Sequence, residues 1–503
     1  MSLTSALNTA QSIFNNTGTQ SSVVSNNIAN AGNTNYNRRE AVVSTTSAGA
    51  TVVQIARSQD ASLQTQFLSS TSDDAAQQRL LKGLEDIKAT MGGNDYETSP
   101  ATYLATLQTA LQTYAGSPSS LTAAQGAVTA AQDVATSLNQ STQAVQSLRE
   151  DADKEISTDV DSLNNLLAQF KQANDAVQSA TVAAASASGA ASPALSDALD
   201  QRDAVLGQIS QLVGIKTVTR DNNDMAIYTS TGTVLFETLP RTVTFQPTNG
   251  YTAGTTGNAI YIDGVPLASG QGSDTNGQGS LQSLIQLRDD VAPTYQKQLD
   301  EIARGLVTMF SETTTDGGTP PTTLSTQPGL FVWTQNSAGD GETPTSATVI
   351  DGMAGTIAVS AQVVTSQGGD PTRLRDGTIN PLSTSQNPTG DSGYSTLLDS
   401  YSNGMDADMS FDPSTGVDTS SSILSFASNS VGWVEGQRSS ANTAAENTSA
   451  ALTRSSDAYS NSTGVNLDEE LTLMMDIEQS YKAGTKLLSA VNDMLQALLD
   501  SAS

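Results

Sequence analysis

Both ends of the chain have the spacing of an amphipathic helix. Near the N-terminus the apolar side chains recur every three or four positions, at Leu3, Leu7, Ile13 and Phe14. The first 37 residues contain no charged side chain, so the polar back of this predicted helix is uncharged. Because uncharged polar groups are cheaper to bury than charged ones, this helix can pack against neighbours on more than one side.

The C-terminal segment has the longer apolar stripe. Asn466 is a predicted N-cap, and Glu469 completes a capping-box pattern three residues later. The stripe then follows a near-heptad spacing through Leu467, Leu471, Met474, Ile477, Tyr481, Gly484, Leu488, Val491, Leu495 and Leu498. Such a stripe requires a partner along its length, so we predict that the two terminal helices pair with each other and with those of other copies.

Helical periodicity also dominates the interior. The longest pattern runs from about 121 to 177 without a proline, and shorter ones cover about 55–90, 100–115, 194–213, 281–311 and 420–458. Long antiparallel helices packed side by side are the usual way to bury such stripes. The predicted bundle is therefore residues 51–213, completed by 280–311 and 416–460, between an N-terminal segment (1–50) and a C-terminal helix (461–503).

Two stretches have extended rather than helical patterns. Residues 214–279 alternate apolar and polar positions, with Asn249-Gly250 and Asp263-Gly264 as turn dipeptides and Asp221–Asp224 as a predicted hairpin tip. Residues 312–415 are rich in Thr, Ser, Gly, Pro and Asp, with short β-like runs. We predict an α+β fold that is mainly α: a long antiparallel helical bundle with terminal coiled-coil helices and two inserted β-rich domains.

Composition excludes several function classes. The 503 residues include no Cys and no His, so a Ser-His-Asp triad, a thiolate nucleophile and a Cys/His zinc site are impossible. The net charge of −29 repels nucleic acid, and no apolar run is long enough to span a bilayer. We expect no catalytic site, no cofactor, no nucleic-acid partner and no membrane insertion. The N-terminus also lacks a cleavable secretory signal, which by itself would indicate a cytoplasmic protein.

Two further motifs are better explained by structure than by chemistry. Asp406, Asp408 and Asp412 could offer oxygen ligands to Ca²⁺, but the central Gly and the final Glu of an EF-hand loop are missing, so a solvated turn is favoured. The Gly-rich run 270–279 fits no phosphate-binding spacing and is predicted to link the first β-rich insert to the helix near Leu281. We therefore expect no metal site.

The N-terminal segment also carries a recognisable signature. Ser25 to Ala31, which includes Asn26, Asn27, Ile28 and Asn30, is followed by Thr34 to Arg39 with Tyr36 at its centre. This sequence resembles the signature of the axial proteins of the bacterial flagellum. The family usually has Gly before the tyrosine, whereas Asn35 stands here and can also accommodate a turn.

Further blocks select a member of that family. Gly464 to Glu470, with Gln479, Tyr481, Ala483 and Lys486 downstream, is similar to the end of the first hook-associated protein, which joins hook to filament. Ala198 to Asp203, Leu212 to Gly214, Gly279 to Asp289 and Leu299 to Glu301 look like the scaffold of the same protein. The resemblance covers about a third of the chain, and 312–415 matches no family that we can name.

The resemblance implies a structural adaptor rather than an enzyme. It implies secretion through the flagellar type III export apparatus by an uncleaved signal, and a place at the hook–filament junction of the bacterial flagellum. The implied partners are further copies in a ring, the hook protein, the second hook-associated protein and an export chaperone that holds the C-terminal helix. The candidate assembly residues are Leu3, Leu7, Ile13, Phe14, Asn26, Asn27, Ile28, Asn30, Tyr36, Leu467, Leu471, Met474, Tyr481, Leu488, Val491, Leu495 and Leu498.

Two other readings stay open on the sequence alone. A hook or distal-rod subunit would share the N-terminal signature but would lack the 465–470 block and the long helix at 121–177. A secreted adhesin or glycan hydrolase would use the β-rich inserts, where Trp333 is the one candidate for stacking on a sugar in 312–415.

Overall fold

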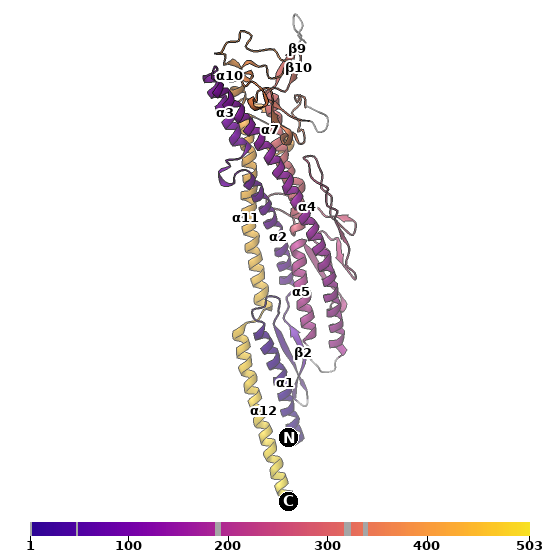
Figure 1. Cartoon of the computed structure of the whole chain (residues 1–503). Helices are drawn as coiled ribbons and strands as arrows, with labels where there is room; N and C mark the ends of the chain where they lie inside the picture. Colours follow the sequence, from indigo (N-terminus) through magenta and orange to yellow (C-terminus); the bar gives the residue numbers. More distant parts are fainter. Residues whose placement is uncertain (1–2, 47–48, 187–192, 316–322, 335–340, 503) are drawn as a thin grey trace.

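A computed structural model describes residues 3–46, 49–186, 193–315, 323–334 and 341–502. The molecule is elongated, with both termini at one end and α3, α10 and the β9–β10 pair at the other (Figure 1). Its long axis follows helices α2 (Ala61–Thr90), α4 (Leu121–Ser186), α5 (Ala194–Leu212) and α11 (Ile423–Thr463). The predicted class, mainly α with small inserted sheets, is confirmed.

The helices of the bundle agree with the sequence pattern. α4 begins at Leu121 and runs to Ser186, beyond the predicted 177. α3 (Pro100–Gly116) follows α2, and α6 (Ser280–Gln286) continues through a π turn (Leu287–Val291) into α7 (Ala292–Met309). One hydrophobic core lies between α2, α3, α4, α7 and α11, and includes Leu84, Leu104, Leu306 and Phe426. The periodicity was informative for α2, α3 and α4, which bury apolar faces at helical spacing, whereas α6 and α7 are buried on nearly every side.

The first insert consists of two small antiparallel sheets. β3 (Ile215–Thr219), β4 (Met225–Thr229) and β5 (Val234–Phe236) form one; β6 (Val243–Thr244), β7 (Tyr261–Ile262) and β8 (Val265–Pro266) form the other. Both rest on the far half of α4, where Phe170 meets Phe236 edge-on and a second hydrophobic core forms.

Two predicted turns of this insert are confirmed. Asn222 and Asn223 have φ of 58° and 57° at the β3–β4 hairpin tip, and Asp263 and Gly264 have φ of 50° and 80° between β7 and β8. Gly250 also has positive φ, but it lies in the longer loop between β6 and β7 and closes no tight hairpin.

The 312–415 region combines short strands with short helices. The strand pairs are β9 (Glu312–Thr315) with β10 (Thr323–Gln327) and β11 (Phe331–Val332) with β12 (Ala358–Val359). A third pair joins β13 (Met409–Ser410) to β14 (Ser420–Ser421), so the region extends beyond the predicted end at 415, and α11 begins only at Ile423. Helices α8 (Met353–Thr356), α9 (Arg373–Asp376) and α10 (Thr396–Gly404) lie between these strands. Leu330 and Phe331 are fully buried in the same core as α7. This region is therefore attached to the bundle by its apolar side chains.

Residues that the sequence offered for chemistry in this region have structural contacts. The indole N–H of Trp333 donates to the Glu342 carbonyl and the ring is buried, so it presents no face to a sugar. Asp412 accepts from the Ser414 N–H at the start of a 3₁₀ turn, and Asp406 accepts from Gln108. Across the described ranges no cluster of acidic side chains could hold a metal ion.

Several charged groups are buried inside the bundle. Arg288 of the π turn is fully buried and lies 2.7 Å from an oxygen of Asp153 on α4. Asp300 of α7 is also fully buried and accepts from the Gly352 and Ala354 N–H groups at the start of α8. Burial raises the pKa of Asp300 to about 7.

Within the described residues no helix is both long and apolar enough to cross a membrane.

The terminal unit, defined as α1 (Leu3–Ala29), β1 (Arg39–Thr46), β2 (Gly49–Arg57) and α12 (Leu467–Ala502), forms one end of the molecule (Figure 1). The predicted boundary at residue 50 is wrong, because it falls inside β2 of a hairpin that packs on α1. Residues 41–56 are uncharged and rich in Val and Thr, a composition typical of strands. α2 therefore begins only at Ala61, where Asp60 caps it by accepting from the Ser62 and Leu63 N–H groups.

Candidate assembly site at the paired termini

α1 and α12 pack against each other along one narrow row, as the sequence predicted. On α12 the buried row repeats every seven residues at Glu470, Ile477, Gly484 and Val491. Ile13 of α1 lies over Gly484, so that a Cβ added there would be 2.8 Å from its Cγ2. Phe14 meets Tyr481 edge-on, with ring centroids 5.2 Å apart. The absence of a side chain at Gly484 therefore allows the two helices to approach closely.

Apolar rows on either side of this contact remain exposed. One row follows the heptad through Leu467, Tyr481, Leu488 and Leu495, each 40–50% exposed. Leu471, Met475, Met494, Leu498 and Leu499 are exposed as well. α1 covers only the central row, because a single helix cannot cover an apolar stripe three positions wide. The terminal unit thus carries an apolar surface that α1 covers only in part.

The uncharged side of α1 is partly used inside the terminal unit. Ser12 and Asn16 both donate to the Ala50 carbonyl of β2, and Asn16 Oδ1 accepts from the Val52 N–H at 2.8 Å. These side chains satisfy backbone groups on an edge strand, which would otherwise be exposed for pairing. Ser12 and Asn16 are suited to this contact because their short side chains reach the backbone of β2 only when α1 lies close to the strand.

The side chain of Asn27 links α1, β1 and α12 at the base of the terminal unit, which is the end nearest the bundle. Its Nδ2 donates to the Arg39 carbonyl and to Glu470, and its Oδ1 accepts from the Tyr36 hydroxyl and the Arg39 N–H, at 2.7–3.1 Å. The amide is fully buried with all four of its hydrogen bonds made. Glu470 is also buried and pairs with Arg38 at 2.7 Å. Burial raises the pKa of Tyr36.

A cluster of charged side chains lies where the terminal unit meets the bundle; we call this junction the neck. The neck cluster comprises Arg39 and Arg57 of the hairpin and Asp197, Asp200 and Asp203 of α5, with ion-pair distances of 2.5–2.8 Å. Burial alone would lower the pKa of both arginines, but their carboxylate partners hold it above the usual range. Both guanidinium groups therefore remain charged.

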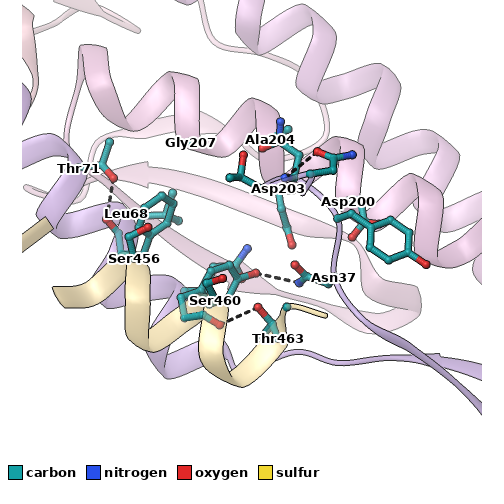
Figure 2. A pocket seen from close by; sticks show the side chains of 18 of the residues that line it. Asn37, Leu68, Thr71, Asp200, Asp203, Ala204, Gly207, Ser456, Ser460 and Thr463 are labelled. Atoms are coloured by element: carbon teal, nitrogen blue, oxygen red, sulfur yellow. Dashed lines mark hydrogen bonds between the residues drawn. The ribbon is translucent and has the colours of Figure 1, made fainter. Parts of the chain in front are cut away.

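A hollow of about 550 Å³ lies beside the neck cluster. Figure 2 shows Asn37, Asp200 and Asp203 on one side of it and Ser460 and Thr463 of α11 on the other. Asn37 and Tyr459 both line the hollow, and the Asn37 amide donates to the Tyr459 hydroxyl at 3.1 Å. The neck is therefore incompletely filled.

The predicted assembly residues fall into three groups. Leu7 and the exposed α12 row lie on the surface, whereas Leu3, Ile13, Phe14 and Met474 are half-buried and Val491 is fully buried in the α1–α12 contact. Asn27 and Tyr36 are buried in the network at the base, Ile28 and Asn30 are half-buried, and Asn26 is exposed. Asn35 lies in a turn as expected, but with negative φ.

Sequence reasoning missed the charged residues of this site. Glu470, Arg57, Asp200 and Asp203 were not among the assembly candidates, although each is buried or half-buried in an ion pair. One signal was present: Glu470 stands seven residues before Ile477, which places a carboxylate on the apolar row of a heptad. A charged side chain in such a position requires a buried partner of opposite charge.

Two family models match the chain. The model described as the flagellar hook-associated protein FlgK helical domain matches residues 84–329. The model described as the flagellar basal body rod FlgEFG protein C-terminal matches residues 457–501, which include nearly all of α12. The two matches include α3 to α7 of the bundle and nearly all of α12, and they leave out most of α2 and of α11.

Among solved structures, the flagellar hook junction protein FlgK from Burkholderia pseudomallei is similar at 21% identity, with a TM-score of 0.40. The match covers 54% of this chain and 46% of that one, so it spans about half the length of the relative. No curated protein matches the chain. Residues 84–329 are therefore similar to the helical domain of flagellar hook-associated proteins of the FlgK type, and residues 457–501 to the C-terminal region of flagellar rod proteins.

Proposed function

We propose that this protein is a non-enzymatic structural adaptor that joins the hook to the filament of the bacterial flagellum. The observation that carries the proposal is the exposed apolar surface of α12, which flanks the contact with α1. In this proposal many copies assemble into a ring through their terminal units, and the bundles and β-rich inserts form the outer layers.

The driving force for assembly is the burial of this surface between copies. Leu488 and Leu495 are about two-fifths exposed in the isolated chain. Burying apolar surface contributes about 25 cal/mol per Å² removed from water. Because each helix pair would contact neighbours on both sides, the apolar rows fit an assembly of several copies better than a simple dimer.

The proposed partners follow from a place at the junction. They are further copies of this chain, the hook protein below, the second hook-associated protein above, and the flagellar type III export apparatus that secretes the chain. A cytoplasmic export chaperone would cover the apolar rows of α12 before export, since an exposed surface of this kind favours aggregation.

The decisive experiment is deletion of the gene. We expect the deletion strain to build hooks without filaments and to release unassembled flagellin into the medium, and the wild-type gene to restore filaments. Normal filaments in the deletion strain would refute the junction assignment.

The alternative of a hook or distal-rod subunit gives a different result in the same strain. Loss of such a subunit would remove the hook itself, so electron microscopy of isolated basal bodies separates the two functions. The match of the FlgK helical domain model to residues 84–329 favours the junction.

A further inference from the structure

The neck joins two parts of the molecule that do not share a hydrophobic core. In the part of the chain that the structure describes, both core clusters lie between Leu68 and Ala445, and none of their buried members comes from the terminal unit. The chain itself crosses the neck at residues 58–60 and 464–466. The terminal unit is therefore held to the bundle mainly by polar side chains.

In the neck cluster, two arginines of the hairpin form ion pairs with one face of α5. Arg39 and Arg57 are opposite each other in the β1–β2 register, at the base of the hairpin. Their partners Asp197, Asp200 and Asp203 are three residues apart on α5, and Asp200 accepts from both arginines. Two planar guanidinium groups that share a carboxylate fix the orientation of the hairpin relative to α5, because charge-assisted hydrogen bonds weaken steeply when they are bent.

We propose that the neck cluster is an angular lock, which sets the angle between the terminal unit and the bundle. When it is broken, the terminal unit pivots as one body about the neck. The hollow of about 550 Å³ beside the cluster leaves room for this movement. The inference concerns the single chain and goes beyond the proposed role in the flagellum.

The remaining contacts across the neck are suited to act as tethers. They include the Asn37–Tyr459 hydrogen bond and the bond from the Arg38 N–H to the Thr463 carbonyl at 2.7 Å. A few such bonds close to the two chain crossings keep the parts together without fixing their angle. By contrast, Asn27 and Glu470 connect elements of the terminal unit to each other, so the unit keeps its own shape.

Distances between spin labels test the proposal on the full chain. Because the protein has no Cys, labels can be attached at introduced cysteines alone. Exposed positions on α11 and α12, Asn447 and Ala483, span the neck; Ser25 with Ala483 reports on the terminal unit, and Asn447 with Asp151 on the bundle. Each pair is measured by double electron–electron resonance in the wild type and in Arg57→Met.

We expect narrow distance distributions for all three pairs in the wild type. Arg57→Met should broaden or shift the distribution across the neck and leave the other two unchanged, and Arg57→Lys should give an intermediate result because lysine keeps the charge but loses the fork. The matched control is Arg79→Met, which removes the Arg79–Glu155 pair between α2 and α4. It should leave the distribution across the neck unchanged.

Three results would overturn the lock. The first is a distribution across the neck that Arg57→Met does not change. The second is a distribution that is already broad in the wild type. The third is equal broadening within the terminal unit, which would mean that the cluster supports the fold of the unit rather than its angle. None of these results depends on whether the protein joins hook to filament, so the two proposals can fail separately.

Discussion

The apolar row that contains Leu488 and Leu495 gives the sharpest test of assembly. We consider replacing both by Asp. In the isolated chain the two leucines are 41% and 40% exposed, and neither belongs to a core cluster of the bundle. The double substitution should therefore weaken the α1–α12 pair locally and leave the main unfolding transition of the bundle in place.

Assembly should respond much more strongly than folding. Full burial of a leucine is worth about 1.5–3 kcal/mol, so covering the exposed two-fifths contributes about 1 kcal/mol per leucine. An unpaired carboxylate in the same contact costs several kcal/mol, so the pair of substitutions costs on the order of 5 kcal/mol per copy. Repeated at every contact of a ring, a cost of this size should abolish the assembly.

The assay compares filament attachment and motility in a deletion strain that expresses each variant. Export of the variant is measured first, because the same row would contact a chaperone. The matched control is Ser489→Asp with Gln496→Asp, which adds the same charge one position further along each turn, on the exposed polar side of α12. If the leucine variant is exported and supports normal filaments, the row is not an assembly surface. If its bundle transition collapses, the row belongs to the folded core.

Three further predictions test the interior and the helix pair. Arg288→Met should lower the free energy of unfolding of the bundle by about 3–5 kcal/mol, because it leaves the buried Asp153 carboxylate without its cation. An unchanged midpoint of denaturant unfolding would contradict the buried ion pair. The pKa of Asp300 is about 7 in the folded state instead of 3.8, so between these pH values the unfolded state binds fewer protons than the folded state. The contribution of Asp300 to the free energy of unfolding therefore falls as pH rises from about 4 to 7 and then levels off, and Asp300→Asn should remove this part of the pH dependence. If the free energy of unfolding of the wild type depends on pH no more steeply than that of the variant, the prediction is wrong. Gly484→Leu should push α1 away from α12, because even a Cβ at this position would lie 2.8 Å from Ile13. Amide hydrogen exchange should then become faster in α1 but not in the bundle. Unchanged protection of the α1 amides from exchange would show that the helices can separate slightly without cost.

Local patterns were sufficient to predict most of the secondary structure. The α4 helix follows from an unbroken stripe that starts at Leu121, and the β3–β4 tip follows from Asn222 and Asn223, because helix periodicity and positive φ are properties of adjacent residues. The pairing of the terminal helices also follows from sequence, since both carry stripes that require a partner. The β1–β2 hairpin was missed, because its pairing depends on contacts with α1 that the local pattern does not show, and the predicted boundary at residue 50 falls inside β2.

The tertiary structure alone decided which part of each stripe is covered. The α12 stripe is three positions wide, and only the contact with α1 shows that Val491 is buried while Leu488 stays exposed. The charged residues depend even more on long-range contacts, since Arg38 and Glu470 are 432 positions apart in the sequence and 2.7 Å apart in the fold. Periodicity shows that a face is apolar but not what covers it. A buried charge is stable only beside a partner that the folded chain brings from elsewhere.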